Sequence, residues 1–414
     1  MIVQPVEAIR AQFPALARSH RGELVAYFDG PGGTQVPRPV VEAMTDYLYH
    51  HNANTHWAYP TSAETDAAIE SARQVLADFL LATPAEIVFG LNMTSLTYHL
   101  GRGLGRGWDA GDEIIVTELD HHANVAPWQA LARERGIVLR TIPLRTADGT
   151  LDLDGLPRLL GPRTRLIAVG MASNALGTVS DVSAVCAKAR HAGVLSFVDA
   201  VHAAPHVLID VRAIGCDFLA CSAYKFYGPH IGILYGRREL LETLDIPRLQ
   251  PAPDTAPERL EPGTQNHEGI VGTAAAVEFL AELGSGGSRR GRLAATYSEL
   301  HRRGAALFRR LWDGLGAIPA VQRFGPPPEA LRTPTLGFVV KGRSSTRVAE
   351  RLAAAGIYVS HGDFYAATVI ERLGLDGEGL VRAGMACYST EDEVDRLVDE
   401  VAAIASTPVI AKTR

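Results

Sequence analysis

One lysine has the surroundings that amine chemistry requires. Lys225 lies between Tyr224 and Phe226, after the apolar run 217–221 and before a Gly-Pro turn and a second apolar run at 231–235. A lysine between aromatic residues at a strand end is poorly solvated, which lowers its pKa and leaves part of the amine neutral. A neutral amine can attack an aldehyde and form a Schiff base. The alternative is a lysine whose stem packs at the strand end while its charge reaches solvent.

A carboxylate lies one predicted strand upstream. The apolar run 194–198 is typical of a strand buried in a parallel sheet, and it ends in Asp199. Ligands of open α/β sheets bind beyond the carboxyl ends of the strands, so Asp199 and Lys225 can reach one crevice. A carboxylate that keeps a pyridine nitrogen protonated, beside a Schiff-base lysine, is what pyridoxal 5'-phosphate (PLP) requires. The pair therefore indicates a PLP enzyme.

Two further segments have residue types that suit an anion. The predicted strand 86–91 runs into a helix start that carries the hydroxyls of Thr94 and Ser95. Backbone N–H groups and hydroxyls at a helix start can hold a phosphate, but the same residues also suit an ordinary N-cap, and the sequence leaves both open. The glycine-rich turn 27–34 can let the backbone approach a ligand, although turn formation is the simpler explanation.

The pair His121-His122 lies among carboxylates just after the predicted strand 113–117. Adjacent side chains diverge, and no third ligand follows at metal spacing, so we predict no metal site. One histidine stacked on an aromatic ligand is the better functional interpretation.

The elements that must position these residues alternate between strand and helix. This pattern predicts a mostly parallel sheet with helices on both faces. The segment 284–288, Gly-Ser-Gly-Gly-Ser, is typical of a flexible link. We therefore predict a large domain over 21–283, and a smaller α/β domain formed by 1–20 and 289–414.

Composition narrows the class of protein. The chain has 414 residues, 47% hydrophobic and 21% charged, with a net charge of −6 and no basic block, which argues against nucleic acid as a partner. No apolar run reaches the length of a membrane span, and the N-terminus has no signal-peptide pattern. Four cysteines without a CxxC pair are typical of reduced thiols, so we expect a cytoplasmic protein.

Taken together, the motifs resemble those of the class V aminotransferase superfamily of fold-type I PLP enzymes, in its cysteine desulfurase and selenocysteine lyase branch. The resemblance extends from about residue 27 to 405. It rests on 120–124 (similar to EHHAN), 173–177 (SNxLG), 199–202 (DxxQ), 222–225 (SxHK), 261–264 (ExGT) and Arg382 (RxS). Three positions depart from these motifs: Asp120 replaces a glutamate, His202 a glutamine and Tyr224 a histidine. The fold that the resemblance implies has a large domain with a seven-stranded, mostly parallel sheet and a smaller α/β C-terminal domain.

The resemblance also implies roles around the cofactor. Lys225 would bind PLP as a Schiff base and later move the Cα proton. Asp199 would pair with the pyridine nitrogen, and His121 would stack on the ring. Asn174 and His202 would face the ring hydroxyl.

Other roles concern the phosphate and the substrate. The phosphate would be held by Thr94, the Met93 backbone, Ser222 and Tyr224. Thr264 would reach the phosphate of a partner subunit, which implies a homodimer. Arg382 would bind the substrate carboxylate as a bidentate fork, and Asn174 would contact the substrate.

One departure changes the expected chemistry. In the desulfurase branch, the loop after the predicted strand 357–359 carries the cysteine that accepts sulfur, and that position here is Tyr365. A phenol, with a pKa of ~10, cannot form a persulfide. The family's arginine before this loop is Ser360. The chain resembles a cysteine desulfurase-like subgroup whose members lack the nucleophile.

No other cysteine replaces the missing one. Cys387 follows Arg382 by five positions on what we predict to be one strand, so the two side chains should face opposite sides. Cys221 lies in a predicted buried strand and Cys186 on a predicted helix. We expect all three to be packing residues.

The leading hypothesis is an enzyme that acts on an L-amino acid at Cα and Cβ, as a C–S lyase by β-elimination. Tyr365 would then be a general acid for the leaving group, or would only shape the pocket. A class V aminotransferase is the alternative, followed by an epimerase. A PLP-fold module without activity is the least favoured, because such a protein could lose Lys225 and Arg382 without penalty.

Overall fold

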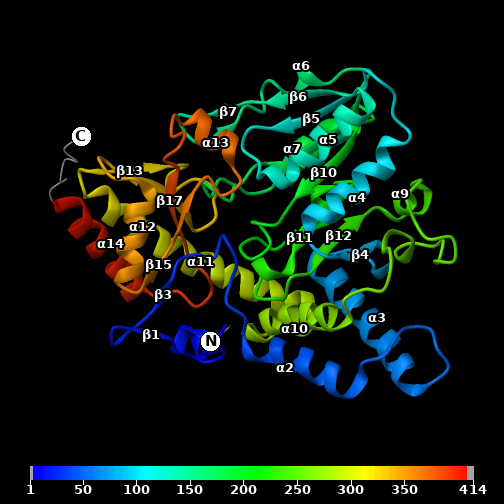
Figure 1. The fold of residues 1–414 in the computed structure, drawn as a ribbon, viewed down its shortest axis with the longest axis horizontal. Helices are drawn as coiled ribbons and strands as arrows, with labels where there is room; N and C mark the ends of the chain where they lie inside the picture. The colour runs from blue at the N-terminus through cyan, green and yellow to red at the C-terminus, as the bar shows by residue number, and fades with distance from the viewer. Residues whose placement is uncertain (1–2, 408–414) are drawn as a thin grey trace.

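A seven-stranded sheet forms the centre of the larger of two lobes (Figure 1). The computed structural model describes residues 3–407. The strand order is β4–β12–β11–β10–β9–β5–β6, and every neighbouring pair is parallel except those of β12, which runs antiparallel to β11 and β4. The strands are β4 (Ile87–Gly90), β5 (Glu113–Thr117), β6 (Val138–Ile142), β9 (Thr164–Gly170), β10 (Leu195–Asp199), β11 (Phe218–Ser222) and β12 (Gly232–Gly236). The predicted mostly parallel sheet is confirmed.

Helices cover both faces of this sheet. Alternate strand residues face two hydrophobic clusters, one built with α3, α7 and α10 and the other with α4, α5 and α9. These helices are α3 (Pro60–Leu80), α4 (Met93–Gly105), α5 (Ala126–Arg135), α7 (Val182–His191), α9 (Arg238–Thr243) and α10 (His267–Leu283). Because the strands other than the edge strand β6 are buried on both sides, they read as largely continuous apolar runs in the sequence; all five residues of β11 are buried.

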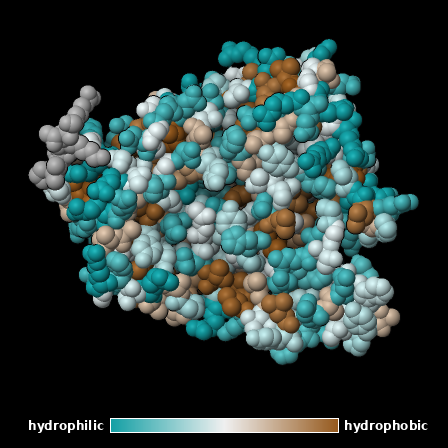
Figure 2. Space-filling view, in the orientation of Figure 1, coloured by the Kyte–Doolittle hydropathy of each residue, from teal (hydrophilic) through white to brown (hydrophobic). Residues whose placement is uncertain are grey.

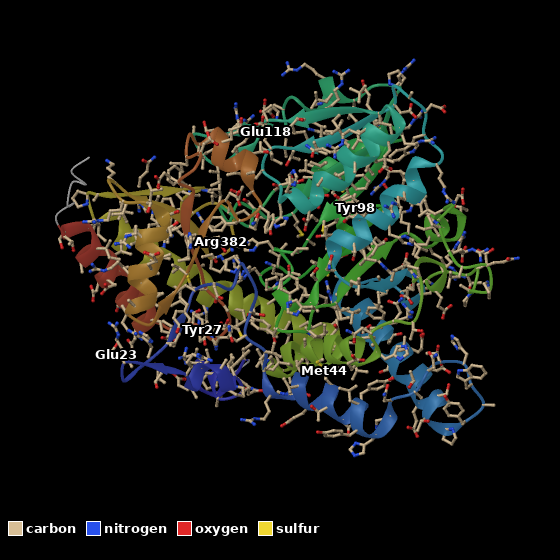
Figure 3. The ribbon with its side chains drawn as sticks, in the orientation of Figure 1. Glu23, Tyr27, Met44, Tyr98, Glu118 and Arg382 are labelled. Atoms are coloured by element: carbon tan, nitrogen blue, oxygen red, sulfur yellow. The ribbon has the colours of Figure 1, made fainter. Side chains whose placement is uncertain are left out.

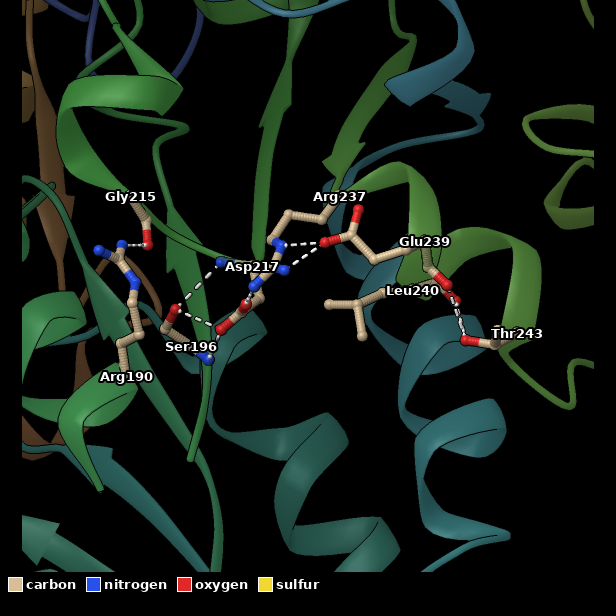
Figure 4. A network of polar contacts seen from close by, with 8 residues as sticks. All are labelled: Arg190, Ser196, Gly215, Asp217, Arg237, Glu239, Leu240 and Thr243. Atoms are coloured by element: carbon tan, nitrogen blue, oxygen red, sulfur yellow. Dashed lines mark hydrogen bonds and ion pairs between the residues drawn. The ribbon is translucent and has the colours of Figure 1, made fainter. Parts of the chain in front are cut away.

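A polar network connects the starts of β10 and β11 (Figure 4). It lies at the opposite end of these strands from Asp199 and Lys225. Asp217, which precedes β11, accepts hydrogen bonds from the backbone and hydroxyl of Ser196 at 2.8 and 2.9 Å. Its other oxygen lies 2.9 Å from Arg237, which also pairs with Glu239. These buried polar groups are therefore paired and position β10 and β11 relative to each other.

The smaller lobe contains a four-stranded antiparallel sheet in the order β13–β14–β17–β16. Its strands are β13 (Val321–Phe324), β14 (Thr335–Val340), β16 (Ser360–Gly362) and β17 (Leu380–Gly384). The helices α11 (Arg289–Gly316), α12 (Ser345–Ala354) and α14 (Glu391–Ser406) pack on it through a third hydrophobic cluster. The remaining helix, α13 (Ala367–Arg372), follows β16.

The N-terminal segment contacts both lobes. Phe13 is buried against the rings of Tyr227 and Phe279 in the larger lobe, whereas β3 (Ala26–Tyr27) pairs in parallel with β15 (Ile357–Tyr358). The short elements of the chain are α1 (Val6–Arg10), β1 (Ser19–His20), β2 (Glu23–Leu24), α2 (Arg38–Asp46), β7 (Leu144–Arg145), β8 (Thr150–Leu151), α6 (Leu156–Leu159) and α8 (Val211–Ile214). The domain limits remain a prediction, and their ends at 1–2 and 408–414 lie outside the described residues. No helix within 3–407 is both long enough and apolar enough to cross a membrane.

Candidate active site

A cavity of about 830 Å³ lies between the two lobes, at the carboxyl ends of the parallel strands. Tyr98 of α4 and Arg382 of β17 line it from opposite lobes (Figure 3), and the space-filling view shows apolar surface in the hollow between them (Figure 2). The predicted site residues that line the cavity are Met93, Thr94, His121, Asn174, Asp199, His202, Ser222, Tyr224, Lys225, Tyr365 and Arg382. The structure thus brings together residues from seven separate segments of the chain.

Lys225 ends the short turn 223–225 that follows β11. Burial, and after it the charge of Arg382, lower the pKa of its amine from 10.5 to about 7, against the opposing effect of Asp199 and Asp29. Part of the amine is therefore neutral near pH 7, as nucleophilic attack on an aldehyde requires.

The glycine-rich turn 27–34 forms part of the cavity wall. The Lys225 amine donates hydrogen bonds to the carbonyl oxygens of Pro31 and Gly32, the latter at 3.0 Å. A Cβ on Gly32 would lie 3.6 Å from a nitrogen of Arg382. This turn therefore does more than reverse the chain, because its backbone orients the lysine.

Two carboxylates lie at the base of the cavity. Asp199, 7% exposed, accepts a hydrogen bond from the Val201 N–H at 2.9 Å through one oxygen, and burial raises its pKa to about 6. Asp120 accepts from the Gly170 N–H at 2.7 Å and from the Asn124 amide at 2.8 Å. Burial and then the charge of Asp199 raise the pKa of Asp120 to about 8. The sequence identified Asp120 only as a motif position, not as a titrating neighbour of Asp199.

His121 presents a neutral ring. Its Nδ1 accepts a hydrogen bond from the Ala123 N–H at 3.0 Å, so the proton of the neutral imidazole is on Nε2. Burial, followed by the charges of Lys225 and Arg382, lowers its pKa to about 4. The ring lies 5.5 Å from that of Tyr365, at 36°. An uncharged imidazole face of this kind suits stacking on a flat ligand.

The start of α4 combines a cap with free donors. Asn92 is the N-cap, and its side chain accepts from the Ser95 N–H at 2.9 Å. The Met93 N–H donates to the Ser222 hydroxyl at 3.0 Å. Within the described residues, neither the N–H nor the hydroxyl of Thr94 has a hydrogen-bond partner. The capping role therefore belongs to Asn92, and Thr94 remains able to bind an anion.

Arg382 is held in place while one nitrogen stays free. It is 4% exposed, donates to the Asn174 carbonyl at 2.9 Å and the Ser360 hydroxyl at 3.2 Å, and lies 4.1 Å from the centre of the Phe364 ring. Its buried Nε has no partner among the described residues. Burial lowers its pKa to about 9, which leaves the guanidinium charged at neutral pH.

The loop after β16 is fixed by two hydrogen bonds that its backbone carbonyls accept. The Phe364 carbonyl accepts from the Asn174 amide at 2.9 Å, and the Tyr365 carbonyl accepts from the His122 N–H at 2.7 Å. Phe364 and Tyr365 have φ of +55° and +57°, which is unfavourable for residues with a Cβ. The loop therefore adopts a strained conformation that presents the Tyr365 ring, 73% exposed, at the mouth of the cavity.

Two predicted residues have surroundings that the sequence did not indicate. His202 lines the cavity, but its Nε2 lies 3.1 Å from the hydroxyls of both Thr333 and Thr335. Thr264 is exposed and does not line the cavity of its own chain. Its predicted contact with a partner subunit stays a prediction.

The four cysteines are all buried. The prediction that Cys387 shares a strand with Arg382 is wrong, because β17 ends at Gly384 and the strand alternation does not extend further. The Cys387 backbone N–H donates to the Tyr227 hydroxyl at 3.0 Å, and burial raises the pKa of the Cys387 thiol to about 12. Burial likewise raises the pKa of the other three thiols, which disfavours the reactive thiolate.

Comparison with known proteins gives one family. Residues 26–397 match the family described as Aminotransferase class-V. The cysteine desulfurase of Pectobacterium carotovorum subsp. carotovorum is 34% identical over 410 residues, 95% of this chain and 96% of that protein. The cysteine desulfurase of Klebsiella pneumoniae subsp. pneumoniae is 37% identical over 412 residues, again 95% and 96%.

Solved structures agree with this result. The apo structure of cysteine desulfurase from Thermococcus onnurineus NA1 superposes with a TM-score of 0.88 at 30% identity, covering 98% of this chain and 99% of that one. The structure of the cysteine desulfurase CsdA (S-sulfonic acid) from Escherichia coli gives a TM-score of 0.84 at 29% identity, covering 97% and 98%. The predicted fold-type I architecture is therefore confirmed.

Proposed function

Because this chain belongs to the aminotransferase class-V family, as a cysteine desulfurase-like PLP enzyme, we propose that it cleaves the C–S bond of an L-amino acid by β-elimination. In this proposal no persulfide forms on the protein. The observation that carries it is the loop beside Arg382, which presents the Tyr365 phenol and no thiol at the cavity mouth, while every cysteine is buried.

The residues present fit PLP. Asp199 has one oxygen that is not engaged by the Val201 N–H and can face the pyridine nitrogen. The Asn174 side-chain oxygen is buried without a partner among the described residues, as expected of a group that meets a ligand. His121 would stack on the ring, and Thr94 would donate to the phosphate. Bound to Lys225, PLP supplies an electron sink for the pair left at Cα.

The residues of the chain then act on the substrate. Arg382 binds the α-carboxylate, using the nitrogen that the protein leaves free. Lys225, with a pKa of about 7 in the free amine, suits removal of the Cα proton near neutral pH. The C–S bond breaks with its electron pair going to sulfur, and the thiol departs with a proton. The three-carbon product is hydrolysed to pyruvate and ammonia.

Tyr365 has two possible roles in this scheme. Its phenol can donate the proton to the leaving sulfur, or its ring can only shape the pocket beside His121. Tyr365→Phe distinguishes them. Loss of a proton donor lowers kcat about 10²–10⁴-fold, and the loss is smaller for a leaving thiol of low pKa. If Tyr365 only shapes the pocket, Tyr365→Phe changes KM, and the size of the change does not depend on the pKa of the leaving thiol.

We also propose a homodimer in which Thr264 reaches the cofactor phosphate of the partner subunit. The exposed segment that carries Thr264 begins at Glu261, whose carboxylate pairs with Arg73 at 2.6 Å and accepts from the Phe89 N–H at 2.7 Å. This anchor would hold Thr264 away from its own cavity and toward a second copy.

The test is product analysis of the PLP-loaded protein with L-cysteine and S-substituted cysteines. β-Elimination releases thiol, pyruvate and ammonia in equal amounts. Alanine formed from cysteine would instead mean desulfuration. It would overturn the interpretation that Tyr365, in place of a loop cysteine, excludes persulfide chemistry. If no thiol appears and other amino acids convert the cofactor to its pyridoxamine form, the enzyme is an aminotransferase; inversion at Cα without cleavage would identify an epimerase.

A further inference from the structure

The connection between β11 and β12 carries a stacked pair of rings. The rings of Tyr224 and His230 lie 5.0 Å apart at 17°, and both residues line the cavity. The Lys225 amine lies 5.0 Å from the centre of the Tyr224 ring. The ring nitrogens of His230 have no hydrogen-bond partner among residues 3–407. The imidazole of His230 therefore stacks on Tyr224, which we expect at the phosphate of PLP, and its ring nitrogens remain available for a ligand.

The backbone fixes this pair next to the start of α4. Ser222 pairs with Gly232, and the Ala223 N–H donates to the Ile231 carbonyl at 2.8 Å, so Tyr224 and His230 are the next residues on the two arms. Both rings line the same cavity as Ser222. The Ser222 hydroxyl accepts the N–H of the first residue of α4.

Gly232 brings the helix start close to this face. A Cβ at Gly232 would lie only 2.4 Å from the Asn92 backbone, so a larger residue would force the N-cap of α4 away. Ser222, which accepts the Met93 N–H, therefore lies beside the helix start, and Thr94, Tyr224 and His230 line the same cavity. These groups form one end of the cavity, which we call the helix-start end.

The charges at the helix-start end are unbalanced for a phosphate ester. A phosphate monoester has a charge of about −1.5 to −2 at pH 7. Of the described residues at this end, Asn92, Met93, Thr94, Ser222 and Tyr224 have uncharged side chains. Lys225 would bond to the aldehyde carbon of PLP, so its amine would not contact the phosphate. His230 is the side chain at this end that can become cationic.

We propose that His230, stacked on Tyr224, donates an N–H to the phosphate of PLP and supplies positive charge there. The proposal rests on the proposed function, because it requires PLP in this cavity. Tyr224 acts as the platform that orients the imidazole, and Thr94 and Ser222 complete the donors. The two aromatic residues then work as one unit, although six positions separate them in the chain.

The test compares PLP with pyridoxal, which has the same aldehyde and no phosphate. Apoprotein is titrated with each compound, and the absorbance change on binding Lys225 gives the dissociation constants. His230→Ala should weaken PLP binding about ten- to a hundred-fold, the range for a charged hydrogen bond, and leave pyridoxal binding unchanged. His122→Ala, which removes an imidazole from the Tyr365 end of the cavity, is the matched control and should affect neither compound.

The results separate this inference from the function on which it rests. Unchanged PLP binding in His230→Ala, or equal losses for PLP and pyridoxal, would overturn the role of His230 while PLP binding by the wild type stands. A wild-type protein that binds neither compound at Lys225 would overturn both. In Tyr224→Leu, His230 loses its platform, and the preference for PLP over pyridoxal should fall in the same direction.

Discussion

Replacing Lys225 by methionine should stabilise the cofactor-free protein, by an amount that depends on pH. The amine has a pKa of about 7 in the folded chain and 10.5 as its ordinary value, because burial and the charge of Arg382 oppose protonation. Below pH 7 the lysine is charged in both the folded and the unfolded state, and the folded state carries the full penalty. As the pH rises from 7 to 10.5, the folded form is already neutral and the penalty disappears.

The size of the effect follows from the two pKa values. The lysine costs the folded state about 4 kcal/mol near pH 7 and about 2 kcal/mol near pH 9. Methionine has a similar volume and no charge, so Lys225→Met removes this cost. It also removes the hydrogen bonds to Pro31 and Gly32, and this loss does not depend on pH. The change with pH is therefore the diagnostic quantity.

The assay is urea unfolding of wild type and variant, both without cofactor, at several pH values between 7 and 10. The free-energy difference between them should shrink by about 2 kcal/mol from pH 7 to pH 9. Lys341→Met, at an exposed lysine, is the control and should show no such trend. A difference that is constant over this range would refute the reasoning that the buried amine is destabilising.

Three further outcomes are expected. Arg73→Met leaves Glu261 buried and unpaired, so it should lower the free energy of unfolding, measured by urea titration, by about 3–5 kcal/mol. The control Arg309→Met, at an exposed ion pair, should lower it by at most about 1 kcal/mol. Equal losses in the two variants would contradict this prediction. Phe364→Leu removes the ring that packs on Arg382 and should raise KM for the amino acid about five- to thirty-fold with little change in kcat, and the reverse split would be inconsistent with a substrate-positioning role. None of the four thiols should react with a thiol reagent until the protein is unfolded. A cysteine that reacts rapidly in the folded protein, and whose modification stops sulfide release, would instead support a persulfide mechanism.

Much of the site was predictable because it follows from strand ends. Asp199 and Lys225 follow apolar runs that become parallel neighbours, and such strands end at the same edge of a sheet. Their convergence therefore needs only the strand pattern and the order of pairing. The same argument places Asn174 beside them, after β9.

Other features depend on contacts that no local pattern encodes. Asp29 influences Lys225 and Arg382 because β3 pairs with β15, more than three hundred positions further along the chain. His230 meets Tyr224 because β12 runs antiparallel, whereas a parallel crossover would have separated them. Cys387 was misplaced because the sequence does not show where β17 ends, and strand ends are the least certain part of such a prediction.

The strand order also determines when this site can form during synthesis. β4 and the start of α4 are made early, but β4 is ordered in the sheet by β12, about 140 residues later. The turn that orients Lys225 is secured later still, since Asp29 bridges to Gly384 and β3 waits for β15. Contacts this distant in sequence form late. A nascent chain therefore cannot complete the cavity until its last strand has left the ribosome, which makes cofactor capture a final event of folding and ties it to full-length synthesis.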